Sequence, residues 1–260
     1  PYTARMKLLA FETSTEACSV AVWVDGHIVD RHEIAPRRHA ECALPWAEAL
    51  LAEAGIARAQ LDAVAVGRGP GAFTGVRLGV ALAQGVALAL DLPVVPVSTL
   101  AALALAAGVP EAGEGGEHDG VRQVLAVIDA RMHEVYAGRF ALTADSASGV
   151  VVARALGAET VASPSILALP ESGVWHAAGS GLGAEAGVLQ ARTTAQPGLH
   201  WASLQPDALP RAADLARLAV AAFARGETVA PERLEPAYLR DKVALTLEEQ
   251  VASRAAAAAR

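Results

Sequence analysis

A glycine-rich loop early in the chain has the composition of an anion-binding turn. A short apolar run leads into Gly67-Arg68-Gly69-Pro70-Gly71, and a long helical pattern begins near Phe73. The free N–H groups and the dipole at a helix N-terminus favour anions such as phosphate. The loop lacks the Lys-Ser or Lys-Thr pair of a phosphate-binding P-loop, so a structural turn is the simpler interpretation. Arg77, one turn into the helix, would neutralise a phosphate or form a salt bridge.

Two carboxylates follow strand-like runs, one in each half of the chain. Glu12 comes after Leu8–Phe11, and Asp129 comes after Val124–Ile128. Short apolar runs of this kind predict buried strands. Some fifty residues after each carboxylate another strand leads into a glycine loop, the second being Gly179–Gly183. The repetition favours a duplicated α/β fold with two βββαβα-type halves.

A His/Cys pair is the remaining candidate for catalysis. His39 and Cys42 are neighbours on the face of a predicted helix. A catalytic Cys-His pair needs an orienting third group and an oxyanion site, and the sequence indicates neither. We therefore predict no catalytic role for this pair.

The other elements follow from apolar spacing and turn residues. The predicted strands are Lys7–Phe11, Cys18–Val24, His27–Ile34, Ala63–Val66, Val94–Val97, Val124–Ile128, Val135–Leu142, Val150–Arg154 and Val174–Ala178. The predicted helices are Arg38–Ala54, Phe73–Leu90, Ser163–Leu169 and Leu209–Arg225. Asp25-Gly26 predicts a hairpin turn, and Ser98 is a helix cap. The stretch from Ala191 to Pro206 gives no regular pattern.

Charge and cysteine content restrict the classes of function. The formal net charge is -7, which argues against strong direct binding to nucleic acid. Cys18 and Cys42 have no metal-site spacing and are typical of reduced cytosolic thiols. The uncharged stretch Leu92–Pro110 contains Pro93 and Pro96, so it predicts a strand and a helix rather than a membrane span.

The predicted duplication resembles the actin-like ATPase (ribonuclease H-like) architecture of sugar kinases and heat-shock chaperones. In that architecture the first carboxylate holds a metal or a water molecule, and the glycine turns approach phosphates. The resemblance therefore implies a candidate vestigial nucleotide site, which consists of Glu12, Thr13, Gly69, Gly71, Arg77 and Asp129.

Longer strings resemble one family within that architecture, the TsaB (YeaZ) family. The most diagnostic is Gly67-Arg68-Gly69-Pro70-Gly71-Ala72-Phe73-Thr74-Gly75-Val76-Arg77. The others are Leu9–Val20, Val97–Leu100, Ile128–Met132 and Glu235–Arg240. The similarity spans about Lys7 to Lys242 and is weakest from Glu111 to Gly120 and from Leu142 to Leu204.

The resemblance implies a non-catalytic scaffold subunit that binds and supports a larger paralogue, TsaD. That paralogue, with a TsaE-like ATPase, transfers a threonylcarbamoyl group to the adenosine next to the tRNA anticodon. The resemblance further implies a cytoplasmic protein without a cofactor or membrane contact, which reaches tRNA only through its complex and forms a homodimer when alone.

Two departures weaken any catalytic interpretation. The family usually carries Asp where this chain has Glu12, whose longer side chain would displace a bound metal or water. The catalytic paralogue carries two metal-binding His where this chain has Thr99 and Leu103. We therefore expect no catalytic residue and no metal site.

In this family the first two helices form the partner surface. Gly71, Gly75 and Gly79 recur every four residues and share one helix face, which would pack against the first helix or receive a subunit. The partner-binding residues implied in this way are Leu44, Trp46, Leu51, Gly71, Gly75 and Gly79. The alternative for Trp46 is that it covers the chain's own core.

The predicted domains are residues 1–110, with the partner-binding helices, and residues 121–242. Residues 111–120 form a Gly- and acid-rich flexible connection, and residues 243–260 form an Ala-rich tail.

Two other functions stay open. An ATP-dependent phosphotransferase would use the duplicated fold and both glycine loops, and a residual protease would use an activity once suspected for the superfamily.

Overall fold

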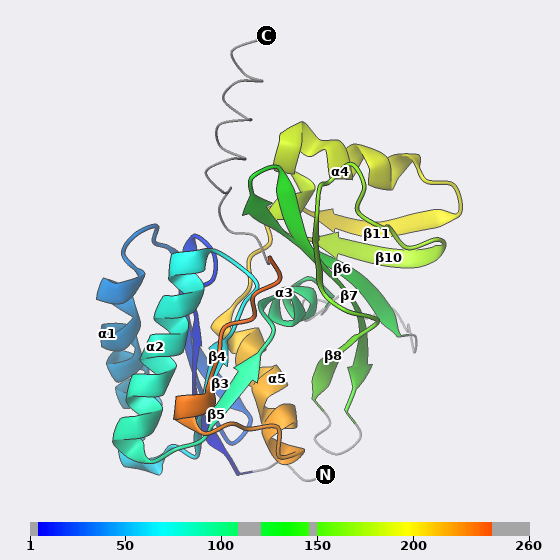
Figure 1. Cartoon of the computed structure of the whole chain (residues 1–260). Helices are drawn as coiled ribbons and strands as arrows, with labels where there is room; N and C mark the ends of the chain where they lie inside the picture. Colours follow the sequence, from blue (N-terminus) through cyan, green and yellow to red (C-terminus); the bar gives the residue numbers. More distant parts are fainter. Residues whose placement is uncertain (1–4, 109–120, 146–149, 241–260) are drawn as a thin grey trace, which may run out of the picture.

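The computed structural model of this chain describes residues 5–108, 121–145 and 150–240, which form two sheets with helices on and between them (Figure 1). The first sheet has the order β3-β2-β1-β4-β5. Its strands are β1 Lys7–Glu12, β2 Ala17–Val24, β3 His27–Ile34, β4 Ala63–Gly67 and β5 Val94–Val97. β1 pairs antiparallel with β2 and parallel with β4. Asp25 and Gly26 join β2 to β3 with φ of 50° and 101°, which confirms the predicted hairpin turn.

The second sheet repeats this arrangement. Its order is β11-β10-β6-β7-β8, with β9 paired to β7. Its strands are β6 Arg122–Arg131, β7 Glu134–Ala144, β8 Val151–Ala155, β9 Thr160–Ala162, β10 Gly173–Ala178 and β11 Leu199–Gln205. β6, like β1, pairs antiparallel with the next strand and parallel with the strand that enters the glycine loop. The shared order and directions confirm the predicted duplicated α/β fold.

The helices join the two halves. α1 (His39–Glu53) and α2 (Phe73–Leu90) cover one face of the first sheet, and α4 (Ala184–Ala195) packs beside β11. α3 (Thr99–Gly108) and α5 (Ala212–Ala224) lie between the sheets (Figure 1). α3 follows the first sheet but packs on β6 and β7, whereas α5 follows the second sheet but packs on β1 and β2. One buried apolar cluster therefore contains residues from both halves, Leu103 and Leu215 among them.

The predicted division at residues 110 and 121 separates the two sheets but not the two packed units. α5 and the segment that follows it belong to the first half. Val229 pairs with Val94, and the Leu234 side chain is buried in the core under α1 and α2. The predicted C-terminal domain over residues 121–242 thus includes a segment that packs on the first half. The predicted connection at residues 111–120 and the tail at residues 243–260 lie outside the described residues.

The sequence pattern failed mainly in the second half. The predicted helix Ser163–Leu169 is a turn, in which the Ser163 carbonyl accepts the amides of Ile166 and Leu167. The last five residues of α4 and all of β11 lie in Ala191–Pro206, the stretch in which no pattern was visible. β11 is half-exposed along its length, and residues Glu185–Gly187 interrupt α4 with positive φ. Such elements lack the clear apolar period that identifies a core strand or helix.

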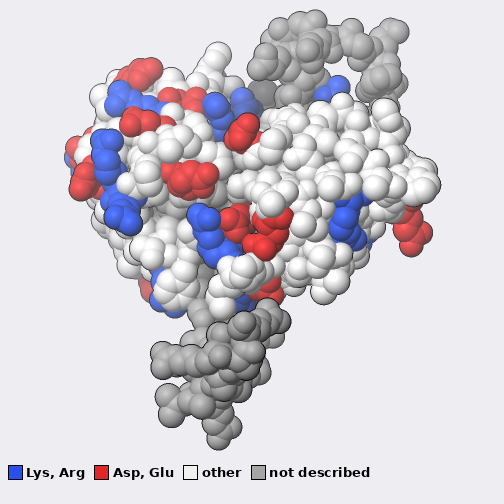
Figure 2. Space-filling view, turned by 90° about the horizontal axis from the view of Figure 1, so that it is seen from above, with Lys and Arg blue, Asp and Glu red and all other residues white. Residues whose placement is uncertain are grey.

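Acidic and basic side chains are interspersed over the surface seen in Figure 2, without a patch of one sign. α2 is the one helix among the described residues that is long and apolar enough to cross a membrane, by length and composition. Its buried face packs on the first sheet, where Gly79, Ala83 and Ala87 lie.

Candidate functional site between the halves

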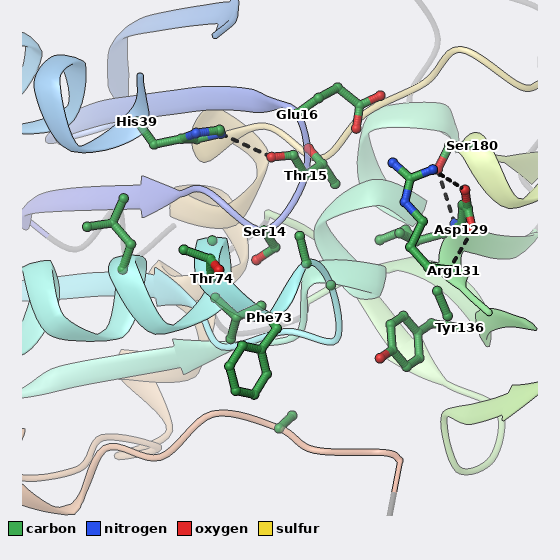
Figure 3. Close-up of a pocket in the computed structure, with 18 of the residues that line it drawn as sticks. Ser14, Thr15, Glu16, His39, Phe73, Thr74, Asp129, Arg131, Tyr136 and Ser180 are labelled. Atoms are coloured by element: carbon green, nitrogen blue, oxygen red, sulfur yellow. Dashed lines mark hydrogen bonds and ion pairs between the residues drawn. The ribbon is translucent and has the colours of Figure 1, made fainter. Parts of the chain in front are cut away.

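A cleft of about 830 Å³ lies between the two halves (Figure 3). The turn after β1 and the first turns of α1 and α2 form one wall. The end of β6 and the β6–β7 turn form the other, and Tyr238–Arg240 close one side. Polar lining residues include Ser14, Thr15, His39, Thr74, Asp129 and Ser180.

Glu12 lies behind this cleft and does not line it. The side chain is 1 % exposed, and its own chain occupies both carboxylate oxygens. The Ser14 amide donates to Oε1 at 2.7 Å, and the Thr99 hydroxyl donates to Oε2 at 3.2 Å. Burial raises the pKa of the Glu12 carboxyl, and the hydrogen bonds from Ser14 and Thr99 oppose that rise. In this geometry the Glu12 carboxylate does not reach the cleft.

Gly67 is the residue that makes room for Glu12. A Cβ atom at Gly67 would lie 1.9 Å from Glu12 Oε2, well inside van der Waals contact. The carboxylate therefore lies flat against the backbone of β4. Gly67 therefore allows this close packing. From the sequence alone, such a glycine looks the same as one that lets the backbone approach a phosphate.

The small-residue face of α2 is filled by the turn after β1. A Cβ atom would lie 2.5 Å from the Ser14 carbonyl oxygen at Gly71, and 2.1 Å from the Thr13 carbonyl oxygen at Gly75. At Gly79 it would lie 2.8 Å from the Thr13 hydroxyl oxygen, which itself donates to the Gly75 carbonyl. The predicted partner contact of these three glycines is wrong, because this chain's own backbone occupies the face. The alternative contact with the first helix is wrong for the same reason.

Arg77 is held by two aromatic rings rather than by an anion. Its guanidinium carbon lies 3.6 Å from the Phe73 ring centroid and 5.6 Å from that of Tyr238. The Nε atom donates to the Tyr238 hydroxyl at 2.9 Å. The predicted choice between a phosphate contact and a salt bridge missed this third arrangement, although Tyr238 belongs to one of the strings that resemble the family.

Asp129 does face the cleft, from the end of β6. It accepts hydrogen bonds from the Arg131 amide at 2.7 Å and from the Arg131 guanidinium at 2.8 Å. Its own amide donates to Ser180 in the second glycine loop (Figure 3). Of the six predicted nucleotide-site residues, only Gly71 and Asp129 line the cleft, while Glu12, Thr13, Gly69 and Arg77 do not. The structure therefore does not bring the six together.

The remaining candidates have structural partners. His39 Nε2 lies 3.0 Å from the Thr15 carbonyl oxygen, and Cys42 is buried. Burial raises the pKa of the Cys18 thiol to about 12. Leu103 is buried between the sheets. Across residues 5–108, 121–145 and 150–240, no three His, Cys, Asp or Glu side chains are grouped as metal ligands.

The predicted partner residues of α1 differ in exposure. Leu51 is buried in the core of the first half, so its predicted partner contact is wrong. Trp46 packs partly buried against the same core, as the alternative interpretation predicts. Leu44 is 44 % exposed and remains a candidate.

Comparisons with known proteins agree with this fold. The family model for TsaD, tRNA N6-adenosine threonylcarbamoyltransferase, matches residues 31–247. The tRNA threonylcarbamoyladenosine biosynthesis protein TsaB of Escherichia coli is 38% identical over 248 residues, which are 92% of this chain and 96% of that protein. TsaB of Haemophilus influenzae is 48% identical over 131 residues, which are 50% of this chain and 52% of that protein.

Solved structures extend the agreement to three dimensions. YeaZ from Pseudomonas aeruginosa is 42% identical, with a TM-score of 0.74 over 90% of this chain and 100% of that one. A second structure with the same values is described as an uncharacterized protein with similarity to peptidase YeaZ. Sequence, strand order and these relatives lead to one assignment: the chain belongs to the TsaB (YeaZ) family.

Proposed function

We propose that this chain is the non-catalytic subunit that binds and supports a TsaD-like catalytic paralogue in the biosynthesis of threonylcarbamoyladenosine in tRNA. In this proposal the chain is cytoplasmic, and it associates with a TsaE-like ATPase and with tRNA only as part of the complex. Alone, the chain forms a homodimer. The names of its relatives support the pathway, and the surface of α2 supports the partner.

The observation that carries the proposal is the exposed apolar surface of α2. The helix has a mean hydropathy of 1.5, yet only 33% of it is buried. Arg77 is the one charged residue in its 18 residues. Its exposed positions include Phe73, Ala81 and Leu88, and Leu88 is 54 % exposed. A largely apolar helix face with a single charged residue marks a surface for another protein.

α1 lies beside α2 and adds Leu44 to this surface. α1 also carries Glu41 and Glu48, both exposed. The exposed positions of the two helices are therefore mainly apolar on α2 and include carboxylates on α1. Such a composition is typical of protein interfaces, in which a polar rim surrounds an apolar core.

We propose that the chain is not catalytic because the residues at the expected catalytic and metal-binding positions have structural roles. The carboxylate of Glu12 is engaged by Ser14 and Thr99, and Leu103 supports the core. The cleft therefore receives no carboxylate from the first half at the position where the actin-like architecture uses one.

The test measures binding to the TsaD-like paralogue of the same organism. Ala81→Glu and Leu88→Glu place a charge on exposed positions of α2, and we expect each to weaken the affinity at least about tenfold, because a buried unpaired charge is costly. Ala191→Glu, at an exposed position of α4, is the matched control and should bind normally. Thermal unfolding should be nearly unchanged in all three, since none of these side chains is buried.

Two outcomes would contradict the partner role. One is a folded chain without micromolar affinity for the paralogue, with or without nucleotide, in calorimetric titration. The other is normal binding by both α2 variants. Trp46→Ala is a useful comparison, because a residue that covers the core should lose stability and keep affinity.

Catalysis is tested separately on the isolated chain. We expect no hydrolysis of ATP or peptides beyond trace contamination. A steady turnover that survives stringent purification and disappears in Glu12→Ala would instead support the phosphotransferase or protease alternative.

A further inference from the structure

The last described segment of the chain connects the two halves at the side of the cleft. We call residues 229–240 the strap. It begins at the far end of the first sheet, runs along α2 and ends beside the β6–β7 turn (Figure 1). Tyr238, Leu239 and Arg240 line the cleft.

Most of the strap is fixed to the first half. Val229 exchanges two backbone hydrogen bonds with Val94, and the side chain of Gln84 donates to the carbonyls of Pro231 and Leu234. The Leu234 side chain is buried in the first-half core. Nearer the cleft, the Ala237 amide donates to the Arg68 carbonyl at 2.8 Å.

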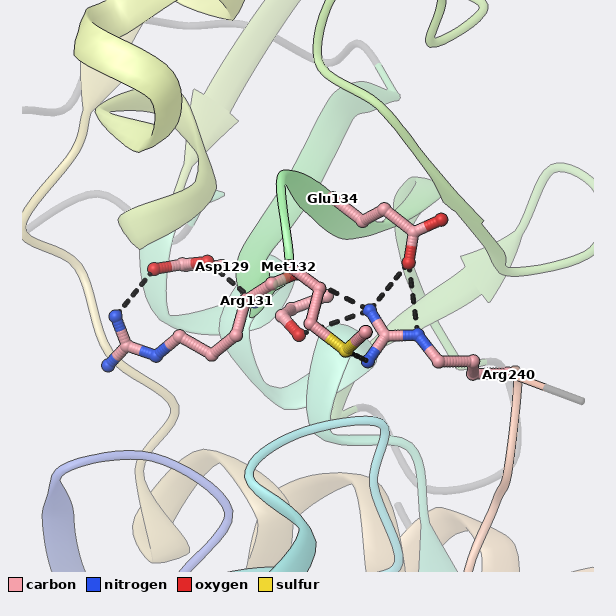
Figure 4. Close-up of polar contacts among 6 residues, drawn as sticks. Asp129, Arg131, Met132, Glu134 and Arg240 are labelled. Atoms are coloured by element: carbon pink, nitrogen blue, oxygen red, sulfur yellow. Dashed lines mark hydrogen bonds and ion pairs between the residues drawn. The ribbon is translucent and has the colours of Figure 1, made fainter. Parts of the chain in front are cut away.

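The final residue of the strap crosses to the second half. The Arg240 guanidinium donates to Glu134 Oε2 through Nε at 3.0 Å and through Nη2 at 2.6 Å (Figure 4). Nη2 also reaches the carbonyls of Ala130 and Arg131, at 3.2 and 3.3 Å. The Arg240 side chain is 17 % exposed, so this contact is largely shielded from water.

The target of Arg240 is the turn that forms the second wall of the cleft. Arg131, Met132 and His133 have φ of 59°, 56° and 63°, three successive residues in the left-handed region. Two carbonyls and one carboxylate of this region converge on one guanidinium, whose planar fork suits several acceptors at once.

The halves have other connections besides the strap. α3 and α5 join the sheets through the buried cluster, and Ser98 at the start of α3 donates to Glu159, beyond β8. We propose that the strap is a latch, in which Arg240 holds the second half closed against the first while the buried helices serve as the hinge. The latch does not depend on the identity of any partner.

The experiment measures the distance between the halves in the full chain. Spin labels at Ala81→Cys on α2 and Ala191→Cys on α4 occupy exposed positions, and the native Cys18 and Cys42 are buried. In a sample diluted with an excess of unlabelled chain, so that label pairs within one chain dominate, electron-electron resonance should give one narrow distance distribution for the latched protein. Arg240→Ala should broaden this distribution and add longer distances. Arg240→Lys keeps the charge but loses the fork, so it should give an intermediate result.

Arg233→Ala is the matched control, since Arg233 is an exposed arginine of the same strap. It should reproduce the wild-type distances. Hydrogen exchange gives a second readout: Arg240→Ala should speed exchange in residues 130–134 about tenfold, while the Ala237 amide keeps its protection.

A distance distribution of Arg240→Ala identical to that of Arg233→Ala would overturn the latch. If Arg240→Ala does not fold cooperatively, Glu134→Gln takes its place, because it weakens the charged contact and leaves the two backbone acceptors. Unchanged distances and unchanged exchange in Glu134→Gln would then overturn the proposal equally.

Discussion

The two halves share one strand order but treat their equivalent carboxylates differently. In the first half, Glu12 at the end of β1 is buried and bonded by its own chain. In the second half, Asp129 near the end of β6 lies at the cleft with its carboxylate 27 % exposed. The duplicated scaffold therefore fixes where a carboxylate lies along the strand. The neighbouring loop determines whether that carboxylate faces water.

The two glycine loops explain this difference. Gly71 and Gly75 press against Thr13 and Ser14, the residues that follow Glu12. In the second half, Gly179 and Gly181 press against Val127, which precedes Asp129. Both loops use glycine to approach the central strand of their sheet closely. Only the first closes over the residues beyond the carboxylate.

The largest loss of stability should come from disrupting the close contact between Gly75 and the backbone of Thr13. Gly75→Ala would place Cβ 2.1 Å from the Thr13 carbonyl oxygen, and a backbone atom has little freedom to yield. We expect a loss of about 3 kcal/mol in the free energy of unfolding, measured by denaturant titration. Gly183→Ala in the second loop meets nothing nearer than the Ser180 carbonyl at 3.8 Å, so its stability should stay close to wild type. Similar losses at both positions would contradict the comparison.

Gly85→Ala controls for helix propensity in the same helix. A Cβ atom at Gly85 meets nothing within 4 Å, so alanine should stabilise α2 by about 0.5–1 kcal/mol. A loss of stability in Gly75→Ala together with a gain in Gly85→Ala would distinguish the packing clash from the helix propensity of alanine.

A smaller loss of stability is expected at Gly67, and it should depend on the side chain at position 12. Gly67→Ala places Cβ against the Glu12 carboxylate, and we expect a loss of about 1–3 kcal/mol. Glu12→Asp withdraws the carboxylate by one methylene, so the double variant should be more stable than the sum of the single losses predicts. Additive losses in a double-mutant cycle would mean that the two residues do not share the space.

The next prediction concerns pH. Burial raises the pKa of Glu12 in the folded chain above its ordinary value of 4.5, so the folded state binds this proton more tightly than the unfolded state. The stabilisation is full below pH 4.5 and is lost as the pH rises through the folded pKa. Glu12→Gln cannot titrate, so it should gain stability relative to wild type as the pH rises above 4.5. A wild-type minus variant difference that is constant across this range would show that the carboxyl is not perturbed.

The smallest effect on stability is expected in the second half, where the Asp129 carboxylate faces the cleft. The Arg131 side chain is 83 % exposed, and solvent screens its contact with Asp129. Arg131→Ala should change the free energy of unfolding by no more than about 0.5 kcal/mol. A loss above about 1 kcal/mol in thermal or denaturant unfolding would place Asp129 and Arg131 in the structural core of the second half.

The sequence predicts the first half well because its elements have strong local signals. α2 has the predicted bounds, and Asp91 ends it in the left-handed conformation before Leu92 and Pro93. Ser98 caps α3 as expected, since its hydroxyl accepts the Ala101 amide at 3.1 Å. β11 has no comparable signal, because half-exposed strands lack a continuous apolar run.

The site was harder to predict because its contacts join residues distant in the chain. Spacing shows that Gly71, Gly75 and Gly79 share a face, but it does not show that Thr13 and Ser14 fill that face. The Arg77–Tyr238 contact spans 161 residues, and the Arg240–Glu134 contact spans 106. Local pattern carries no information about such pairs.

The exchange of α3 and α5 between the halves has a consequence for the order of folding. The first sheet is complete in sequence at Val97, yet one of its faces is covered by α5, which begins at Ala212. During synthesis that apolar face waits for more than a hundred further residues to leave the ribosome. A fragment that ends before α5 should therefore aggregate or recruit chaperones, whereas the whole chain should acquire its structure in one late, concerted step governed by these long-range contacts.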